Sequence, residues 1–189
     1  MLIVVRHGQT VWNAEGRLLG REDPPLDGIG LVQAERIAAV VAADRVVSSP
    51  LQRAQQTAAA LGRPVEIDER WIELDYGELE GVAVGEVPAS TWAEWQADLG
   101  FHPPGGETLA ELGARVGAAC DDLIAEAVDQ DVVVVTHVSP VKAAVAWAIG
   151  VGGEVAWRTF VGPGSITRIA AGRRGAVLQS FNETGHLTI

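Results

Sequence analysis

Short, mainly apolar runs and longer amphipathic stretches alternate along the chain. The short runs are typical of strands covered on both faces of a sheet, and they lie at 2–6, 45–48, 65–68 and 132–136. Apolar positions at helical spacing predict helices at 27–43, 50–61, 108–128 and 139–149. Asp27 is the expected N-cap of the first helix, and Pro50 is expected in the first turn of the second. Two further runs, 165–170 and 176–181, predict a hairpin around Gly172 to Gly175.

This order of elements predicts an α/β fold, a three-layer αβα sandwich with a mostly parallel central sheet. The 189 residues suffice for one substantial core, and no repeat or linker divides them, so a single domain over 1–189 is expected. Segment 82–106 has little periodicity beyond a short helix at 91–99. We therefore expect it to leave the sheet as a short cap over the substrate. Its residues Trp92, Trp95 and Phe101 would form either an apolar wall for a ligand or a small satellite core.

Two of the predicted strands end directly at a histidine. Arg6 and His7 follow the run 2–5, and Thr136 and His137 follow the run 132–135. Ligands of open α/β sheets bind outside the carboxyl ends of the strands, so both histidines are expected at one site. An isolated histidine is more often a core residue bonded to a carbonyl, but the guanidinium of Arg6 beside His7 favours an anion site. Imidazole is also a competent nucleophile at neutral pH, which suits phosphoryl transfer.

The residues after His7 add further features of an anion site. Gly8 would let the backbone approach the anion closely, and Thr10 and Asn13 could add neutral hydrogen bonds from the same loop. Arg53 is predicted in the first turn of a helix that begins where a strand ends, a position that favours anions. Arg6 and Arg53 together would clamp a phosphoryl group, whose charge is spread over three oxygens.

A histidine nucleophile requires a separate acid to protonate the leaving oxygen. Segment 71–81 supplies four carboxyl groups, and spacing alone does not choose among Glu73, Asp75, Glu78 and Glu80.

The formal net charge of −11 argues against a nucleic-acid partner or a broad anionic-membrane surface. Because the apolar run before Arg6 is too short for a signal peptide and no run reaches membrane-spanning length, we expect a cytoplasmic location. The single cysteine, Cys120, lies on the apolar stripe of a predicted helix and is expected to be buried and inert.

Four ordered blocks resemble the histidine phosphatase superfamily, also called the phosphoglycerate-mutase-like family. The first is Arg-His-Gly with the following Gln, Thr and Asn (6–10 and 13), and the second is Ser-Pro-x-x-Arg-Ala-x-x-Thr-Ala (49–58). The third is Glu-x-x-Tyr-Gly-x-x-Glu-Gly (73–81), and the fourth is Pro-Gly-Gly-Glu (104–107). The histidine after a valine-rich strand, His137, completes a resemblance that covers essentially the whole chain.

The resemblance implies that His7 is the phosphorylated nucleophile and Glu73 the proton donor. It implies that Arg6, Arg53 and His137 bind the phosphate, His137 as a cationic donor, without a metal or other cofactor. The family usually has glycine after the last histidine, whereas this chain has Val138. The amide of Val138 can serve the phosphate only if that position has ordinary helical or extended backbone.

The branch of the family follows from the insert and the tail. Mutases carry a long insertion after the third block, whereas here only 82–104 precedes the fourth, which favours an open, water-accessible site and hydrolysis. The tail 182–187 looks like that of small phosphatases of the α-ribazole phosphatase and broad-specificity type. We expect a phosphomonoester hydrolase for a small phosphorylated metabolite, with a phosphoglycerate mutase and a silent phospho-ligand binding module as alternatives. A homo-oligomer, a ligand role for His102 and the function of His186 stay open, with a packing role favoured for His186.

Overall fold

The computed structural model describes residues 1–172 and 175–188, and within them six strands form one sheet. The strands are β1 (Leu2–Arg6), β2 (Arg45–Ser48), β3 (Val65–Ile67), β4 (Val132–Thr136), β5 (Ile166–Gly172) and β6 (Gly175–Glu183), in the order β3-β2-β4-β1-β5-β6. β1 to β4 are mutually parallel, and β5 is antiparallel to both of its neighbours, β1 and β6. The carboxyl ends of β1, β2 and β4 therefore meet at one edge.

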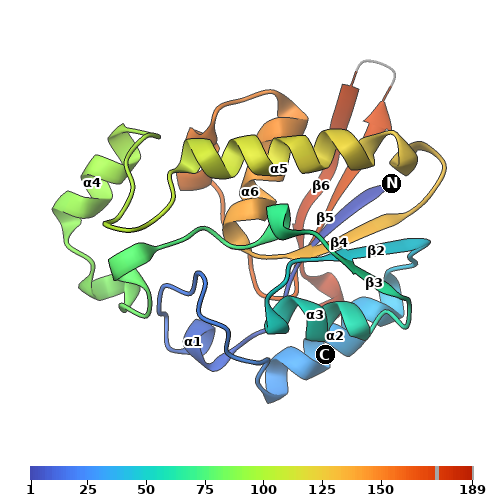
Figure 1. Cartoon of the computed structure of the whole chain (residues 1–189). Helices are drawn as coiled ribbons and strands as arrows, with labels where there is room; N and C mark the ends of the chain where they lie inside the picture. Colours follow the sequence, from blue (N-terminus) through green and yellow to red (C-terminus); the bar gives the residue numbers. More distant parts are fainter. Residues whose placement is uncertain (173–174, 189) are drawn as a thin grey trace.

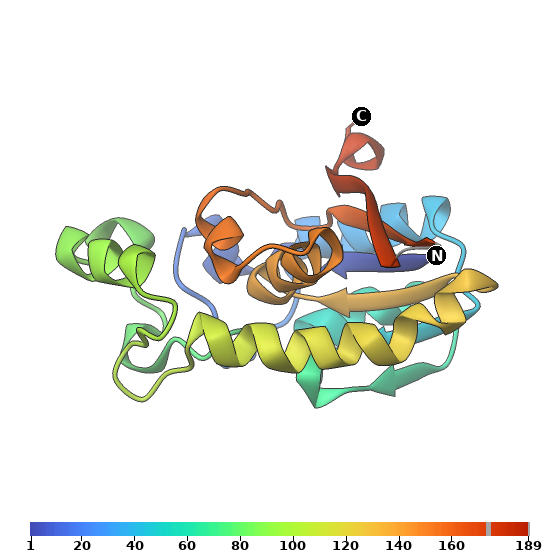
Figure 2. The same cartoon turned by 90° about the horizontal axis from the view of Figure 1, so that it is seen from above.

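Helices cover both faces of this sheet, as Figures 1 and 2 show. The helices are α1 (Val11–Ala14), α2 (Gly28–Val40), α3 (Gln52–Ala59), α4 (Ala89–Ala97), α5 (Leu109–Ile124) and α6 (Val138–Ile149). Leu2 and Val4 of β1 point into the core formed with α5 and α6, whereas Ile3 and Val5 point into the core formed with α2 and α3. Every residue of β1 is buried, which explains its unbroken apolar run. The predicted three-layer α/β fold with a mostly parallel sheet is confirmed.

Element boundaries differ from the prediction where capping or proline chemistry decides them. Asp27 caps α2 as expected, with its carboxylate accepting from the Gly30 N–H at 2.8 Å. Pro50 is not in the first turn of α3, because that helix begins at Gln52 after Leu51 as the N-cap. The helix predicted over 108–128 ends at Ile124 and continues as a short 3₁₀ turn. The predicted hairpin is present as β5 and β6, but Arg173 and Arg174 of its turn lie outside the described residues.

The predicted excursion carries α4 away from the sheet, at the left of Figure 1. Trp95 is buried there, stacks on Trp92 at a centroid distance of 5.7 Å and lies 5.8 Å from Trp157. These aromatic rings join the core on the α5 and α6 side and also line a cavity. The rings thus belong to the main core rather than to a separate satellite core, and a ligand wall stays a prediction. Across the described residues, no helix combines the length and apolar character needed to cross a membrane.

Candidate active site

The two predicted strand-end histidines lie side by side at the carboxyl edge of the sheet. Arg6 pairs with Thr136 in the parallel register of β1 and β4, and the His7 N–H donates to the Thr136 carbonyl at 2.9 Å. One residue further along each strand, the rings of His7 and His137 have centroids 5.0 Å apart in an edge-on arrangement. Strand register alone thus brings together two residues that are 130 positions apart in the sequence.

The hydrogen bonds of His7 fix which of its nitrogens is free to react. Nδ1 lies 2.6 Å from the Gly8 carbonyl, which can only accept, so Nδ1 carries the proton. Nε2 lies 3.2 Å from Nε of Arg53, which can only donate, so Nε2 presents its lone pair. Burial and the nearby charges of Arg53 and Arg6 hold the pKa of His7 well below its usual range. The ring is therefore neutral at physiological pH, with its Nε2 lone pair on the side of Arg53.

His137 has the opposite arrangement. Its Nδ1 accepts from Nε of Arg53 at 3.2 Å, so its Nε2–H donates to Oγ of Ser49 at 2.7 Å. Burial, Arg53 and His7 hold the pKa of His137 well below its usual range. Without a bound anion the ring of His137 is therefore neutral, because burial beside two arginines disfavours its charged form, and a cationic His137 in the presence of phosphate stays a prediction. A bound phosphate dianion would oppose this effect.

Arg53 is fixed by backbone acceptors as well as by the two histidines. Its side chain is completely buried, and its two terminal nitrogens donate to the carbonyls of Gly20 and Glu22, each at 2.7 Å. Glu80 in turn accepts from the Gly20 N–H at 2.6 Å and so holds this loop. The guanidinium of Arg53 is thereby oriented before any ligand binds.

Arg6 supplies the second positive charge. One terminal nitrogen donates to the Val161 carbonyl at 2.7 Å, while Nε is buried and has no partner among the described residues. Burial lowers the pKa of Arg6 to about 10, so the side chain stays cationic at neutral pH. The predicted pair of arginines flanking His7 is present.

Only one of the four candidate carboxyl groups faces the site. Glu73 is 2% exposed, lines the same cavity as His7 and accepts from the N–H groups of Leu74 and Ser139, at 2.7 and 3.2 Å. Ser139 lies in the first turn of α6, where N–H groups lack helical partners. Of the other three, Asp75 caps the Gly77 N–H, Glu80 holds the loop around Gly20, and Glu78 is exposed.

A cavity of about 190 Å³ gives access to the site, with a lining that includes Arg6, His7, Asn13, Arg17, Glu73 and Val138. His7 and Glu73 are each only 2% exposed, so both side chains lie at the inner wall of this cavity. Oδ1 of Asn13 accepts from the Thr10 N–H at 3.1 Å, which turns the amide NH₂ of Asn13 toward other acceptors. Val138 is the first residue of α6, so the helical backbone required for its N–H to serve an anion is present.

Two predicted residues have a different role from the expected one. Thr10 is fully buried, and its hydroxyl forms the capping box of α1 with Asn13, so it orients Asn13 rather than lining the cavity. A Cβ on Gly8 would lie 2.4 Å from the Gly30 carbonyl oxygen. Gly8 is therefore required by the close approach of α2, while the predicted approach of the anion at this position stays a prediction.

Several contributors carried too little sequence signal to be assigned a role. Ser49 and Thr57 stand in the second block, but only the fold shows that Ser49 binds His137 and that Oγ1 of Thr57 accepts from the Gly8 N–H at 3.1 Å. Arg115 donates to the carbonyls of Arg70 and Ile72, at 2.6 and 2.7 Å, and so holds the segment that leads into Glu73. No spacing rule connects a helix arginine with carbonyls more than 40 residues away.

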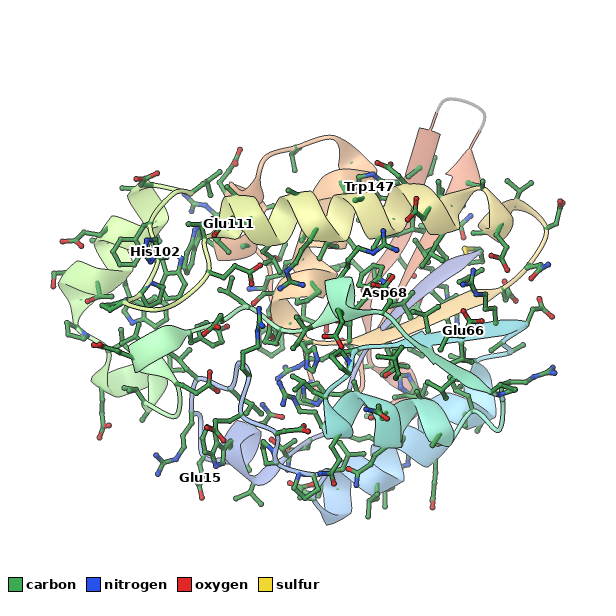
Figure 3. All side chains as sticks on the ribbon, viewed as in Figure 1. Glu15, Glu66, Asp68, His102, Glu111 and Trp147 are labelled. Atoms are coloured by element: carbon green, nitrogen blue, oxygen red, sulfur yellow. The ribbon has the colours of Figure 1, made fainter. Side chains whose placement is uncertain are left out.

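The remaining candidates lie outside the site. His102 is exposed, on the loop between α4 and α5 (Figure 3), and its Nδ1 donates to the Pro103 carbonyl. His186 donates to the carbonyl of Gly164, in agreement with the favoured packing role. Cys120 is buried as predicted, and burial raises the pKa of its thiol. In residues 1–172 and 175–188, no group of three or more His, Cys, Asp or Glu side chains is placed to hold a metal ion.

Comparison with known proteins places this geometry in a family. Residues 2–184 match the model of the histidine phosphatase superfamily (branch 1). A mutant phosphoserine phosphatase of Entamoeba histolytica, solved in complex with phosphoserine, superimposes with a TM-score of 0.92 at 27% identity, covering 99% of this chain and 98% of that one.

Two curated relatives extend the comparison. A bifunctional protein of Mycobacterium tuberculosis is 33% identical over 98% of this chain, which spans 54% of that relative's length. The chain thus spans about half the length of the first such relatives. A "Probable phosphoglycerate mutase GpmB" of Yersinia pestis is 30% identical over 97% of this chain and 93% of its own length.

Proposed function

The chain belongs to branch 1 of the histidine phosphatase superfamily, and from this premise we propose that it hydrolyses small phosphomonoesters through a phosphohistidine on His7. The observation that carries the proposal is the hydrogen bonding of His7. Its Nδ1–H is bound to the Gly8 carbonyl, and its Nε2 lone pair points toward the buried Arg53. A neutral, oriented imidazole beside two arginines is what attack on phosphorus requires.

In the first step of the proposed reaction, Nε2 of His7 attacks phosphorus and the bond from phosphorus to the ester oxygen breaks. Glu73 gives its proton to the departing alcohol oxygen. Arg6 and Arg53 stabilise the charge on the equatorial oxygens, and the N–H of Val138 and the amide of Asn13 add neutral donors. A phosphoryl group on Nε2 would also hydrogen-bond to His137, whose pKa it raises.

In the second step, Glu73, now ionised, accepts a proton from water as the water oxygen attacks phosphorus. The bond from phosphorus to Nε2 breaks, and inorganic phosphate leaves with His7 neutral again. Arginines supply the positive charge throughout, so the proposed cycle uses neither a metal nor another cofactor.

Two features support hydrolysis over transfer to a second substrate. The segment between Gly81 and Gly105 is short, and the cavity at His7 is lined by residues of the main fold with only Val84 from the cap segment. The solved relative bound to phosphoserine is a phosphatase. The mutase alternative has its own support in the relative from Yersinia pestis.

Turnover of p-nitrophenyl phosphate tests the proposal, with His7→Ala as the control. We expect hydrolysis by the wild type and its loss in the variant. Absence of turnover for this ester and for a panel of alkyl phosphates would favour the silent binding module instead. Conversion of 3-phosphoglycerate to its 2-isomer with a bisphosphoglycerate primer, faster than release of phosphate, would favour the mutase.

Three broader features belong to the same proposal. A single domain over 1–189, with 82–106 as its substrate cap, is supported by the one sheet with two apolar faces. A cytoplasmic location is supported by the class of small phosphorylated substrate. The absence of nucleic-acid and membrane partners is supported by the net charge of −11, whereas homo-oligomerisation stays open.

A further inference from the structure

Two further cavities adjoin the site on the side of α6. The nearer one, of about 160 Å³, is walled by the rings of Trp92, Trp95 and Trp157 and shares Tyr76 and Val138 with the cavity at His7. The farther one, of about 290 Å³, runs between α5 and α6 and shares Leu109, Ser139, Lys142 and Ala156 with the nearer one. The three cavities thus form a row from the nucleophile to the groove between the two helices, and we call the two outer ones the apolar cleft.

Glu73 lies where this row begins. Its carboxylate lines the cavity at His7 and accepts from the N–H of Ser139, a residue that lines both parts of the apolar cleft. The hydroxyl of Ser139 lies 3.4 Å from that of Tyr76. A proton donor must face the ester oxygen that departs, so the alcohol part of the substrate leaves on the side of Glu73. Ser139, which donates to Glu73, lines both parts of the apolar cleft, so the cleft adjoins that side of the site.

Small residues keep the groove open. α5 contributes Gly113 and Gly117, and α6 contributes Ala143 and Ala146 to the lining. A Cβ built on Gly113 meets no atom within 4 Å, and one on Gly117 meets only Trp147, at 3.7 Å. Trp147 lies beside α5 in Figure 3, where its indole N–H donates to Asp121 at 2.9 Å. Trp147 itself lines the groove, and this hydrogen bond joins α6 to α5 there.

The polar groups of the apolar cleft are few. The indole N–H groups of Trp95 and Trp157 are buried and have no partner among the described residues. The ammonium of Lys142 donates to the Ala156 carbonyl at 2.7 Å, and burial lowers its pKa. A ligand here would meet mostly carbon, together with a few donors.

We propose that the apolar cleft binds the alcohol portion of the substrate, and that the preferred substrates are phosphomonoesters of alcohols with an extended apolar group. This inference rests on the proposed function, because it takes Glu73 as the group that faces the leaving oxygen. It adds that selectivity among phosphomonoesters comes from contacts beyond the phosphate. Those contacts are made by the cap tryptophans and by the groove between α5 and α6.

A homologous series of ethyl, butyl, hexyl and octyl phosphate tests the inference. The four leaving alkoxides have nearly equal basicity. Differences in kcat/KM therefore report binding of the alkyl chain rather than the chemical step. Transfer of each methylene into an apolar site corresponds to about a fourfold gain in affinity, and kcat/KM should rise by about that factor per methylene until the groove is full. A flat series would contradict the inference, while His7-dependent turnover of all four esters would leave the proposed function standing.

A substitution within the groove locates the effect. Gly113→Leu adds a large side chain at a position that lines the groove and has open space, and leucine favours the helix over glycine, so folding is preserved. The ratio of kcat/KM for octyl to ethyl phosphate should fall by about tenfold or more. Ala114→Leu, next to it on α5 and outside the cavity lining, is the matched control and should keep the wild-type ratio. An unchanged ratio in Gly113→Leu would mean that the alkyl chain of the substrate binds elsewhere and would overturn the assignment.

Discussion

The protonation states of His7 and His137 follow from their neighbours. Each ring has one nitrogen fixed by a guanidinium hydrogen, and each ring is buried beside positive charge. A neutral His7 needs no base to become a nucleophile. The second histidine completes the hydrogen-bonding environment of Arg53.

Acid should destabilise the fold through these two rings. In the unfolded chain each imidazole takes up a proton near pH 6.5, whereas in the folded chain the pKa of each is lower. Below pH 6.5 the unfolded state therefore binds more protons, and the free energy of unfolding falls with pH by roughly 1.4 kcal/mol per pH unit for each histidine. Urea denaturation in phosphate-free buffer between pH 7 and 5 measures this slope.

Direct titration separates this effect from that of carboxylates. NMR of the imidazole Cε1–H groups should show His7 and His137 remaining neutral throughout this range, because their pKa values lie well below the usual one. Titration of both buried rings near pH 6.5 would contradict the assigned protonation states.

The assignment of Glu73 as proton donor predicts a dependence on the leaving group. Glu73→Gln should slow alkyl phosphates by about 10²- to 10⁴-fold, because a basic alkoxide needs the proton. For p-nitrophenyl phosphate the first step should be nearly spared, and slow dephosphorylation should give a burst of phenolate. Stopped-flow and steady-state rates for both esters measure the difference.

The neighbouring carboxylates provide matched controls. Asp75→Asn and Glu78→Gln should show no dependence on the leaving group, since Asp75 caps a turn and Glu78 is exposed. If Asp75→Asn showed the dependence and Glu73→Gln lacked it, the proton donor would be misassigned.

At this scale the sequence identified the reactive residue types but not all their partners. His7, Arg53 and His137 were predictable because each stands at the end of a buried strand or in the first turn of the following helix. Residue types and spacing left four carboxyl groups as candidates. The fold favours Glu73 among them, because it turns Asp75 and Glu80 toward backbone N–H groups. The neutral state of His137 also required it, because burial is not visible in the sequence.

Among the elements, α2 and α3 hold the loop between β1 and α1 in place. The Gln9 N–H donates to Oε1 of Gln33 at 2.8 Å, and Thr57 of α3 accepts from the Gly8 N–H. Gly8 and Gly30 face each other so closely that neither has room for a side chain. The sequence indicated that Gly8 permits a close approach of the backbone. Only the packing of α2 shows which contact requires a residue without a side chain there.

A pair of glycine substitutions in α2 tests this contact. Gly30→Ala would put a Cβ 2.1 Å from the Gln9 carbonyl oxygen and should destabilise the protein by about 1–3 kcal/mol, as overpacking does. Gly28→Ala, two residues earlier in the same helix, meets no atom within 4 Å and should be neutral or stabilising by up to about 1 kcal/mol. Urea denaturation of the two variants compares them, and equal stabilities would contradict a tight contact.

For the molecule as a whole, the net charge is negative, and the positive charge of the site comes from a few buried arginines. The net charge is −11, yet Arg6 and Arg53 are buried together at the sheet edge. The alternation of strands and helices was readable from the sequence because buried parallel strands are almost entirely apolar. The row of cavities beside α6 was not readable, because it depends on how the cap tryptophans pack against α5 and α6.

A site whose charge comes from arginines should not depend on metal ions. Activity on p-nitrophenyl phosphate should survive exhaustive treatment with EDTA, and vanadate should inhibit competitively by occupying the same clamp. Loss of activity on chelation, restored by zinc or magnesium, would contradict this account.

The most direct test is the chemical identity of the phosphoenzyme. Substrate should phosphorylate Glu73→Gln, which slows dephosphorylation, and ³¹P NMR of the base-denatured protein distinguishes phosphate on Nε2 of histidine from phosphate on Nδ1. The hydrogen bond from Nδ1–H to the Gly8 carbonyl predicts phosphate on Nε2 of His7, acid-labile and absent from His7→Ala. Phosphate on Nδ1, on another residue, or retained in His7→Ala would contradict the proposed mechanism.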